Sequence, residues 1–535
     1  MDKTLHTVVK GDWRLIFFFK DNLKSCLARF LTGGLILFVL FEAASLVCRL
    51  IIPFFPFILD ESGKSIVFSL LNAEAWLFFS SAAVGPVFAL VWMFSWVIWP
   101  FSVFLGLFGK HERDDSKVCN RSMLFKEFVK TARSGLDRAF RPVRRGSSFL
   151  LVVAVSLVLV TLVTVYPYFP SLNSSGKFVG VDVPFYEWQL MELNSLGNLN
   201  SVVFRAFQFP DRPLSLLFLF LGWKVTGVSI RQATVISEVV LGLLLLLATY
   251  FFVRTAGFNS FYASLAMLFT VASYHVTVGM YGGLFANMVG LVFMYSFLGL
   301  VFACLRTCSW RLCLMAVVFQ SLLLFSHANT WDMSMGIVGV FFLFILLEWL
   351  IKRKNSSRLL MLFAILVAGV SLNFVRNSVL HIGIGTVEAV GVAKSGVSLF
   401  NLLSVWQTLG ASLGSFMGIG FVNPVLLFFA GLGGIAVALD SRLVSRFLTT
   451  SLVAASVPFI LGDYVVQTRI LYNLPVQVFA FLGLLALLSF VERFFSAKEA
   501  KRIGFLLVLL IIIVELNYVF RCSFYLTTVN FFPVH

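Results

Sequence analysis

The stretch LFANMVGLVFMYSFLGLVFACL, residues 284–305, decides the fold class. It contains no charged residue, and as an α-helix rising about 1.5 Å per residue it crosses the roughly 30 Å hydrocarbon core of a bilayer. Apolar runs of similar length recur along most of the chain. In lipid, the peptide groups of such a run are satisfied only inside a helix. The sequence therefore predicts an all-α protein, a polytopic transmembrane helix bundle.

The overall composition agrees with this prediction and excludes a soluble globular enzyme. Of the 535 residues, 59% are hydrophobic and only 12% are charged, whereas soluble domains carry about 25% charged residues. The mean hydropathy is +0.96. The net charge of +16 is interpreted as a signal of membrane orientation, and no nucleic-acid partner is expected. The odd number of cysteines, 7, gives no disulfide framework.

Thirteen membrane spans are predicted from apolar runs of suitable length. Two come early, at 31–56 and 80–108, and are followed by a basic segment at 109–147. The other eleven are expected at 148–168, 230–252, 259–277, 284–305, 311–327, 332–351, 359–376, 421–439, 447–463, 470–491 and 504–520.

The basic residues sort to one side of this map, since alternate loops hold most of the 41 Lys and Arg residues. By the positive-inside rule the N-terminus is cytoplasmic and the C-terminus lies outside. The first apolar run is expected to be a signal anchor rather than a cleaved leader. The expected location is the plasma membrane of a prokaryote, or the endoplasmic reticulum membrane if the source is eukaryotic.

The chain is divided into two parts. Residues 1–147 are predicted to be an N-terminal accessory module of two spans with a basic, amphipathic cytoplasmic segment that contacts membrane lipids. Residues 148–535 are predicted to form an eleven-span membrane domain. Its outer loops 169–229 and 377–420 are too polar, or too interrupted by Gly, Pro and Asn, to span lipid.

The first outer loop carries the residues that predict chemistry. Asp182 lies in VDVPFYEWQ, residues 181–189, just before a proline that opens an aromatic, helical segment. Further on, Arg212 and Pro213 precede an apolar stretch that ends near Lys224 and is too short to span. This stretch is predicted to be an interfacial helix. A carboxylate at the level of the membrane surface is suited to accept a proton there.

The order of these motifs resembles the GT-C superfamily of integral-membrane glycosyltransferases, which includes protein O-mannosyltransferases and aminoarabinose transferases. An acidic residue opens Asp182-Val-Pro-Phe-Tyr186, and an Arg-Pro-Leu stretch runs over 212–227. Ser273-Tyr-His275 then ends an apolar hairpin, and Arg469-Ile-Leu-Tyr472-Asn-Leu-Pro475 opens a late span. The resemblance covers about 148–492.

The resemblance implies transfer of a sugar from a polyprenyl-phosphate-linked donor to a protein, lipid or glycan acceptor at the outer membrane face. By position, Asp182 is the catalytic residue that binds the acceptor or takes its proton, and Arg469 lies near the donor phosphate. An arginine there is suited to the charge that grows on a leaving phosphate. The full set of expected substrate-binding residues is Glu187, Arg212, Lys224, His275, His327, Asp332, Arg469 and Tyr472.

The sequence departs from the superfamily in one outer turn, residues 275–287, which contains no carboxylate. Many members have a second acid there that helps to hold a metal or the acceptor. The missing acid argues against a two-carboxylate metal site, and a divalent metal such as Mg²⁺ or Mn²⁺ is kept as an open alternative. Two alternative functions are also kept: a non-catalytic scaffold or subunit with a membrane-protein partner, and a secondary transporter.

Other polar residues have both a functional and a structural interpretation. His327 and Asp332 lie at an outer turn. In the functional interpretation they bind a sugar or relay a proton, and in the structural one Asp332 caps the following helix. Glu42 and Glu238 lie in or near apolar spans and are expected to pair with Arg49 and Arg231. Glycines at a four-residue spacing, Gly410, Gly414 and Gly418, indicate either close helix packing or a flexible lid.

Overall fold

The computed structural model describes residues 2–51, 69–71, 148–173, 179–208, 212–353, 355–378, 423–440, 442–461 and 464–528. Within these ranges every regular element is a helix. The expected span 80–108 and the basic segment 109–147 lie outside the described residues, as do the loop glycines Gly410, Gly414 and Gly418. The predicted all-α class is confirmed for the part that the structure describes.

The helices run as follows: α1 Asp2–Ile51, α7 Ser148–Val165, η3 Tyr166–Tyr168, α8 Val183–Ser195, α9 Leu199–Phe207, α10 Pro213–Thr226, α11 Ile230–Thr255, α12 Ser260–Val271, α13 Tyr274–Gly282, α14 Phe285–Thr307, α15 Trp310–Ser326, α16 Ala328–Lys352, α17 Ser356–Ser378, α20 Pro424–Ala438, α21 Leu443–Leu461, α22 Tyr464–Asn473, α23 Val476–Phe494 and α24 Ala497–Thr528.

Within the described ranges, nine helices are long and apolar enough to cross a membrane, by length and composition. They give the chain the make-up of a multi-pass integral membrane protein. Three further expected spans correspond to α15, α20 and α21, whose described apolar stretches are shorter. The apolar stretch after Arg212, which the sequence predicts to be too short to span, is a separate helix of 14 residues, α10.

The centre and the periphery of the bundle differ in burial. Protein buries 78% of the apolar window of α14 and 72% of that of α23, but only 17% of that of α1 and 22% of that of α17. Helices that are apolar on all sides are stable both inside the protein and against lipid, because lipid tails are as apolar as a protein core. The exposed apolar side chains of α17, such as Phe363 and Phe374, are therefore suited to face lipid.

Glycine sets the closest helix contact. A Cβ atom on Gly433 of α20 would collide with the carbonyl oxygen of Phe479, and one on Gly483 of α23 would collide with the carbonyl oxygen of Phe429. The two glycines thus let α20 and α23 pack backbone against backbone. This pair accounts for the close approach of α20 and α23.

Local sequence fixes several helix ends. Ser229 and Gln232 form a reciprocal capping box at the start of α11. Asn259 caps α12, and its side chain accepts a hydrogen bond from the main-chain amide of Tyr262. The late span expected at 470–491 is divided at Leu474 and Pro475 into the short α22 and the long α23. Arg469 and Tyr472 consequently lie on a helix of their own.

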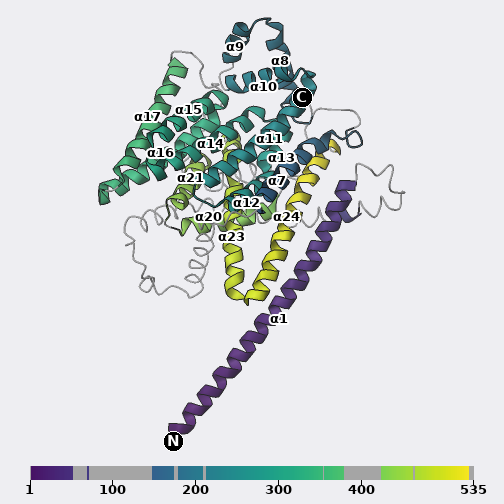
Figure 1. Cartoon of the computed structure of the whole chain (residues 1–535), viewed down its shortest axis with the longest axis vertical. Helices are drawn as coiled ribbons and strands as arrows, with labels where there is room; N and C mark the ends of the chain where they lie inside the picture. Colours follow the sequence, from purple (N-terminus) through teal and green to yellow (C-terminus); the bar gives the residue numbers. More distant parts are fainter. Residues whose placement is uncertain are drawn as a thin grey trace.

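Helix α1 packs along α24, the last described helix (Figure 1). The side-chain amide of Asn517 donates to the main-chain carbonyl of Glu42 at 2.8 Å and to its carboxylate at 2.7 Å. The hydroxyl of Tyr166 donates to the carbonyl of Arg49 at 2.7 Å. The first helix is therefore joined to the bundle through buried polar contacts.

Candidate functional site

Asp182 lies at the start of α8, in the end of the molecule that α8, α9 and α10 form (Figure 1). Its main-chain amide donates to the carbonyl of Gly282, at the end of α13, at 2.9 Å. Two glycines with left-handed φ values, Gly180 (+122°) and Gly283 (+62°), permit this approach. A Cβ on Gly180 would lie 2.7 Å from a carbonyl oxygen of α13. The Asp182 side chain does not cap α8, which leaves its carboxylate for other partners.

Two guanidinium groups act on the half-buried carboxyl group of Asp182. Burial raises the pKa of Asp182 above its ordinary value, and the charges of Arg212 and Arg469 oppose that rise. Arg212 directly precedes α10, and Arg469 lies on α22, far along the chain. The fold thus places Arg212 and Arg469, two predicted site residues from distant parts of the chain, near enough for their charges to act on Asp182.

Tyr186, which the sequence analysis did not single out, holds Arg212 in this site. Its side chain is buried, and its phenolic oxygen accepts hydrogen bonds from Arg212 Nη1 (3.3 Å) and from the main-chain amide of Ala286 (3.1 Å). The guanidinium of Arg212 also lies over the Phe185 ring, 5.5 Å from its centroid. The signal was spacing, because Tyr186 stands one helical turn after Asp182.

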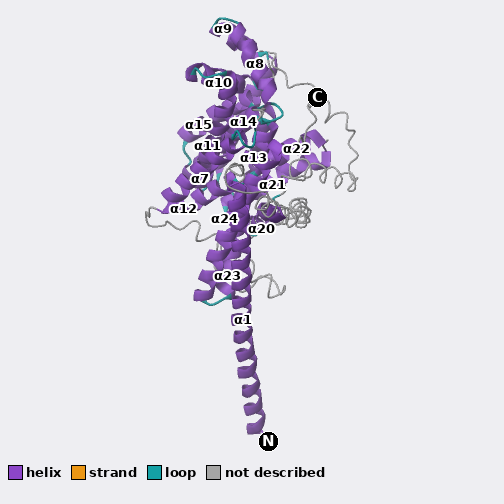
Figure 2. Cartoon of the chain, turned by 90° about the vertical axis from the view of Figure 1, so that its right-hand side faces the viewer, coloured by secondary structure: helices purple, strands orange, loops and turns teal. Residues whose placement is uncertain are grey.

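Helix α22 packs against α13, beside which it lies in Figure 2, and His275 and Tyr472 are in contact there. The Tyr472 hydroxyl donates to the main-chain carbonyl of His275 at 2.7 Å, and the Tyr274 hydroxyl donates to that of Leu471 at 2.6 Å. The His275 ring is fully buried, with Nδ1 3.1 Å from the Ser273 hydroxyl. The Tyr472 side chain and the His275 main chain thus help to hold α22, the helix that carries Arg469.

His327 and Asp332 lie at the beginning of α16. His327, rather than Asp332, caps this helix, since its Nδ1 accepts from the main-chain amide of Thr330 at 3.3 Å. The cap prediction for Asp332 is wrong because the helix begins one turn earlier than expected. The Asp332 side chain is exposed, whereas His327 is buried.

Glu187 and Lys224 lie on α8 and α10. Glu187 is partly exposed. Lys224 is exposed, donates a hydrogen bond to Asn194 of α8, and lies 4.6 Å from the centroid of the Trp223 ring. Its described contacts thus join α10 to α8.

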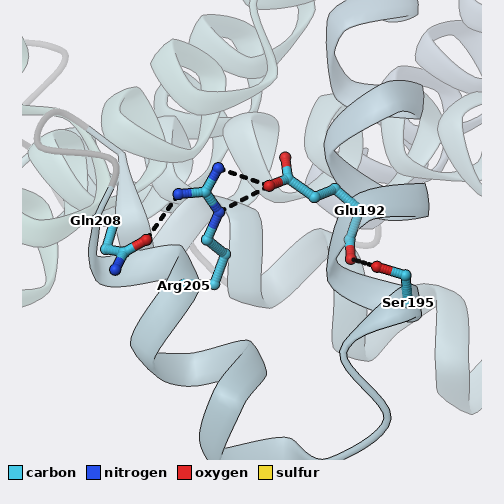
Figure 3. A network of polar contacts seen from close by, with 4 residues as sticks. All are labelled: Glu192, Ser195, Arg205 and Gln208. Carbon is cyan, nitrogen blue, oxygen red and sulfur yellow. Dashed lines mark hydrogen bonds and ion pairs between the residues drawn. The ribbon is translucent and has the colours of Figure 1, made fainter.

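An ion pair fixes α9 to α8, as Figure 3 shows. Arg205 contacts one carboxylate oxygen of Glu192 through Nε at 2.8 Å and through Nη2 at 2.6 Å. Its Nη1 donates to the Gln208 side chain at 2.7 Å. The pair spans the turn between the two helices, so it stabilises the loop that presents Asp182.

Three carboxylates inside the bundle lie against polar groups of other elements. Glu238 accepts a hydrogen bond from the Tyr168 hydroxyl at 2.8 Å, Glu42 accepts from Asn517, and Glu515 accepts from Asn423. Glu515 also lines a small apolar pocket between α12 and α24. These contacts lower the cost of burying each carboxylate.

A divalent metal does not fit the described surroundings of Asp182. No group of three or more His, Cys, Asp or Glu side chains in the described ranges is arranged to hold a metal ion. Mg²⁺ and Mn²⁺ favour several oxygen ligands, but here one carboxylate stands with two guanidinium groups. The donor set suits an anion instead.

No protein-family model matches the chain, and no curated protein matches it. The function is therefore inferred from the residues of the site.

Proposed function

We propose that this protein is a membrane glycosyltransferase of the GT-C type that uses a polyprenyl-phosphate-linked sugar. The observation that carries the proposal is that the charges of Arg212 and Arg469 act on the carboxyl group of Asp182 at one end of an apolar bundle. A lipid phosphate needs cations at the membrane surface while its tail stays in lipid. An acceptor hydroxyl needs a base beside them.

In the proposed reaction the acceptor oxygen attacks the anomeric carbon of the sugar. The Asp182 carboxylate takes the proton of the acceptor hydroxyl as the new bond forms. The bond between the anomeric carbon and the phosphate oxygen breaks, and its electron pair leaves with the polyprenyl phosphate. Arg212 and Arg469 stabilise the charge that develops on that phosphate. No step is assigned to a metal.

Burial of Asp182 supports the role of base. A raised pKa strengthens the carboxylate as a proton acceptor once it is ionised. Tyr186 supports the role of Arg212, because its two hydrogen bonds and the Phe185 ring hold the guanidinium in one orientation. The proposed site faces the outer side of the membrane, with the N-terminus in the cytoplasm.

The test uses the purified full-length protein with a synthetic polyprenyl-phosphate sugar, and it measures release of polyprenyl phosphate. We expect Asp182→Asn to lower kcat by about a hundredfold or more, in the range of lost general-base catalysis. Asp440→Asn, which changes a carboxylate in the turn between α20 and α21, is the matched control. Full activity of a folded Asp182→Asn protein contradicts the proposal.

A second test separates the two arginines from the base. Arg469→Ala is expected to raise the KM for the lipid donor more than it changes use of the acceptor, because its charge pairs with the phosphate. Equal effects on both substrates argue against a phosphate role. Arg205→Ala, which breaks the ion pair of Figure 3, controls for general damage to this end of the molecule.

A scaffold without catalytic activity is the second candidate. It is favoured by the single carboxylate of the site, because no second acid in the described ranges acts on Asp182. This candidate predicts stable co-purification with a membrane-protein partner, no bound polyprenyl lipid by mass spectrometry, and no effect of Asp182→Asn on that assembly.

A further inference from the structure

A buried polar cluster joins three helices, α14, α16 and α22. It consists of Thr330 and His327 at the start of α16, Asn287 at the start of α14, and Asn473 at the end of α22. The Thr330 hydroxyl oxygen lies 2.8 Å from His327 Nδ1, 2.8 Å from Asn287 Oδ1 and 3.2 Å from Asn473 Oδ1. All four side chains are buried, and Thr330 is 0% exposed.

The hydrogen-bond balance makes Thr330 the centre of this cluster. A hydroxyl group has one proton to donate, so it cannot donate to three acceptors at once. His327 Nδ1 already accepts from the Thr330 main-chain amide. At least one asparagine amide must therefore turn and donate to the hydroxyl. Either amide is free to do so, because the Nδ2 atoms of Asn287 and Asn473 have no other partner in the described ranges.

Two members of the cluster, Asn473 and Asn287, lie close in the chain to residues that carry or hold the arginines of the proposed site. Asn473 stands four residues after Arg469 in α22, so the two side chains share one helix face. Asn287 follows Ala286, whose main-chain amide donates to the phenol that also binds Arg212. The cluster thus connects the helix that carries Arg469 with the helix end that holds the partner of Arg212.

We propose that Thr330 is a positioning residue, whose hydroxyl sets the separation of the Arg212 and Arg469 guanidinium groups by tying the end of α22 to the start of α14. The inference rests on the proposed function for the role of the two arginines in binding a lipid phosphate. Its structural part, that Thr330 fixes Arg469 relative to Asp182, is independent of any substrate.

The first experiment measures binding of farnesyl phosphate to the full-length protein in detergent. Thr330→Val removes the hydroxyl at nearly constant volume and is expected to weaken binding about tenfold, whereas Thr330→Ser keeps the hydroxyl and is expected to stay within about twofold of the wild type. Thr270→Val is the matched control, because Thr270 is equally buried and its hydroxyl donates only within its own helix, to Ala266 at 2.8 Å.

A double-mutant cycle decides whether the effect passes through Arg469. If it does, Thr330→Val causes little further loss of binding in an Arg469→Ala background. Fully additive losses overturn the inference. A wild-type protein that does not bind farnesyl phosphate counts against the proposed function instead.

A second readout needs no ligand. It measures the melting temperatures of the wild type and of Asp182→Asn as a function of pH. The difference between the two temperatures changes with pH, and the midpoint of that change reports ionisation of Asp182. Moving Arg469 away removes a positive charge, so Thr330→Val is expected to shift the midpoint to higher pH, whereas Thr270→Val leaves it unchanged. An unshifted midpoint in Thr330→Val overturns the inference. If that variant does not fold, Asn473→Ala breaks the same connection and must give the same upward shift.

Discussion

The main-chain amide of Asp182 is hydrogen-bonded to the carbonyl oxygen of Gly282 at 2.9 Å. This single bond attaches the first outer loop to the C-terminal end of α13, while the N-terminal end of α13 binds α22 through His275 and Tyr472. One short helix, α13, therefore contacts the proposed base Asp182 at one end, and at the other end it contacts α22, the helix that contains Arg469. Four predictions follow from this arrangement and from the packing around it.

The first prediction concerns pH and the stability of the Asp182 variant. Burial raises the pKa of Asp182 in the folded state above its ordinary value of 3.8. The folded protein then binds more protons than the unfolded chain between these two pKa values, so the wild type loses stability as pH rises through that window. Asp182→Asn does not ionise. We expect it to melt at a higher temperature than the wild type at neutral pH, and at a similar temperature below about pH 4. Equal melting curves at all pH values contradict this.

The second prediction concerns the glycine beneath the loop. Gly180→Ala places a Cβ 2.7 Å from a carbonyl oxygen of α13 at a φ of +122°. We expect the loop to move and sugar transfer to fall at least about tenfold, with a destabilisation of about 1–3 kcal/mol. Gly227→Ala is the control, since Gly227 also has a positive φ but no neighbour within 4 Å. Similar losses of transfer in both variants show that backbone strain alone is responsible.

The third prediction concerns the contact of α20 with α23. Gly433→Ala or Gly483→Ala drives a methyl group into a backbone carbonyl of the facing helix. We expect losses of about 1–3 kcal/mol or more in the free energy of unfolding, because a close-packed interface resists added volume. Gly431→Ala in the same helix adds its methyl group where no atom lies within 4 Å. The measurement is unfolding in detergent, and equal stability of the Gly433 and Gly431 variants argues against backbone contact.

The fourth prediction concerns the carboxylate of Glu238, which is fully buried and accepts the Tyr168 hydroxyl bond. Tyr168→Phe removes that donor, and we expect a loss of about 1–3 kcal/mol in the free energy of unfolding. Adding Glu238→Leu replaces both polar partners and is expected to recover much of this loss. If the double variant is less stable than Tyr168→Phe alone, the Glu238 carboxylate makes another stabilising contact and the prediction fails.

Helix starts near the candidate site could be predicted from the sequence, because residues of the first outer loop carry local signals. Asp182 before a proline, and Arg212 before Pro213, predicted helix starts that the structure has at α8 and α10. Tyr186 was not singled out, because an aromatic residue in an apolar helix looks like core. Only the approach of Arg212 and of the Ala286 amide gives its hydroxyl a role.

The motif at 469–475 has a structure that the sequence did not predict. The sequence predicted one span from 470 to 491, but Pro475 separates the short α22 from α23. Helix α22 is kept in place by contacts such as that of Tyr472 with His275, residues 197 positions apart. No local pattern encodes such a contact. The same holds for Thr330, whose hydroxyl joins Asn287 and Asn473 from two other helices.

The sequence by itself determined that this chain is helical and crosses a membrane many times, because a run of apolar residues in lipid has no other way to satisfy its peptide groups. It also determined where many helices begin, since caps and prolines act over a few residues. The tertiary structure alone decided that the charges of Arg212 and Arg469 act on Asp182. The charge of each side chain is a property of the sequence, but its effect on a neighbour depends on distance and burial, and the packing of α13 and α22 sets both.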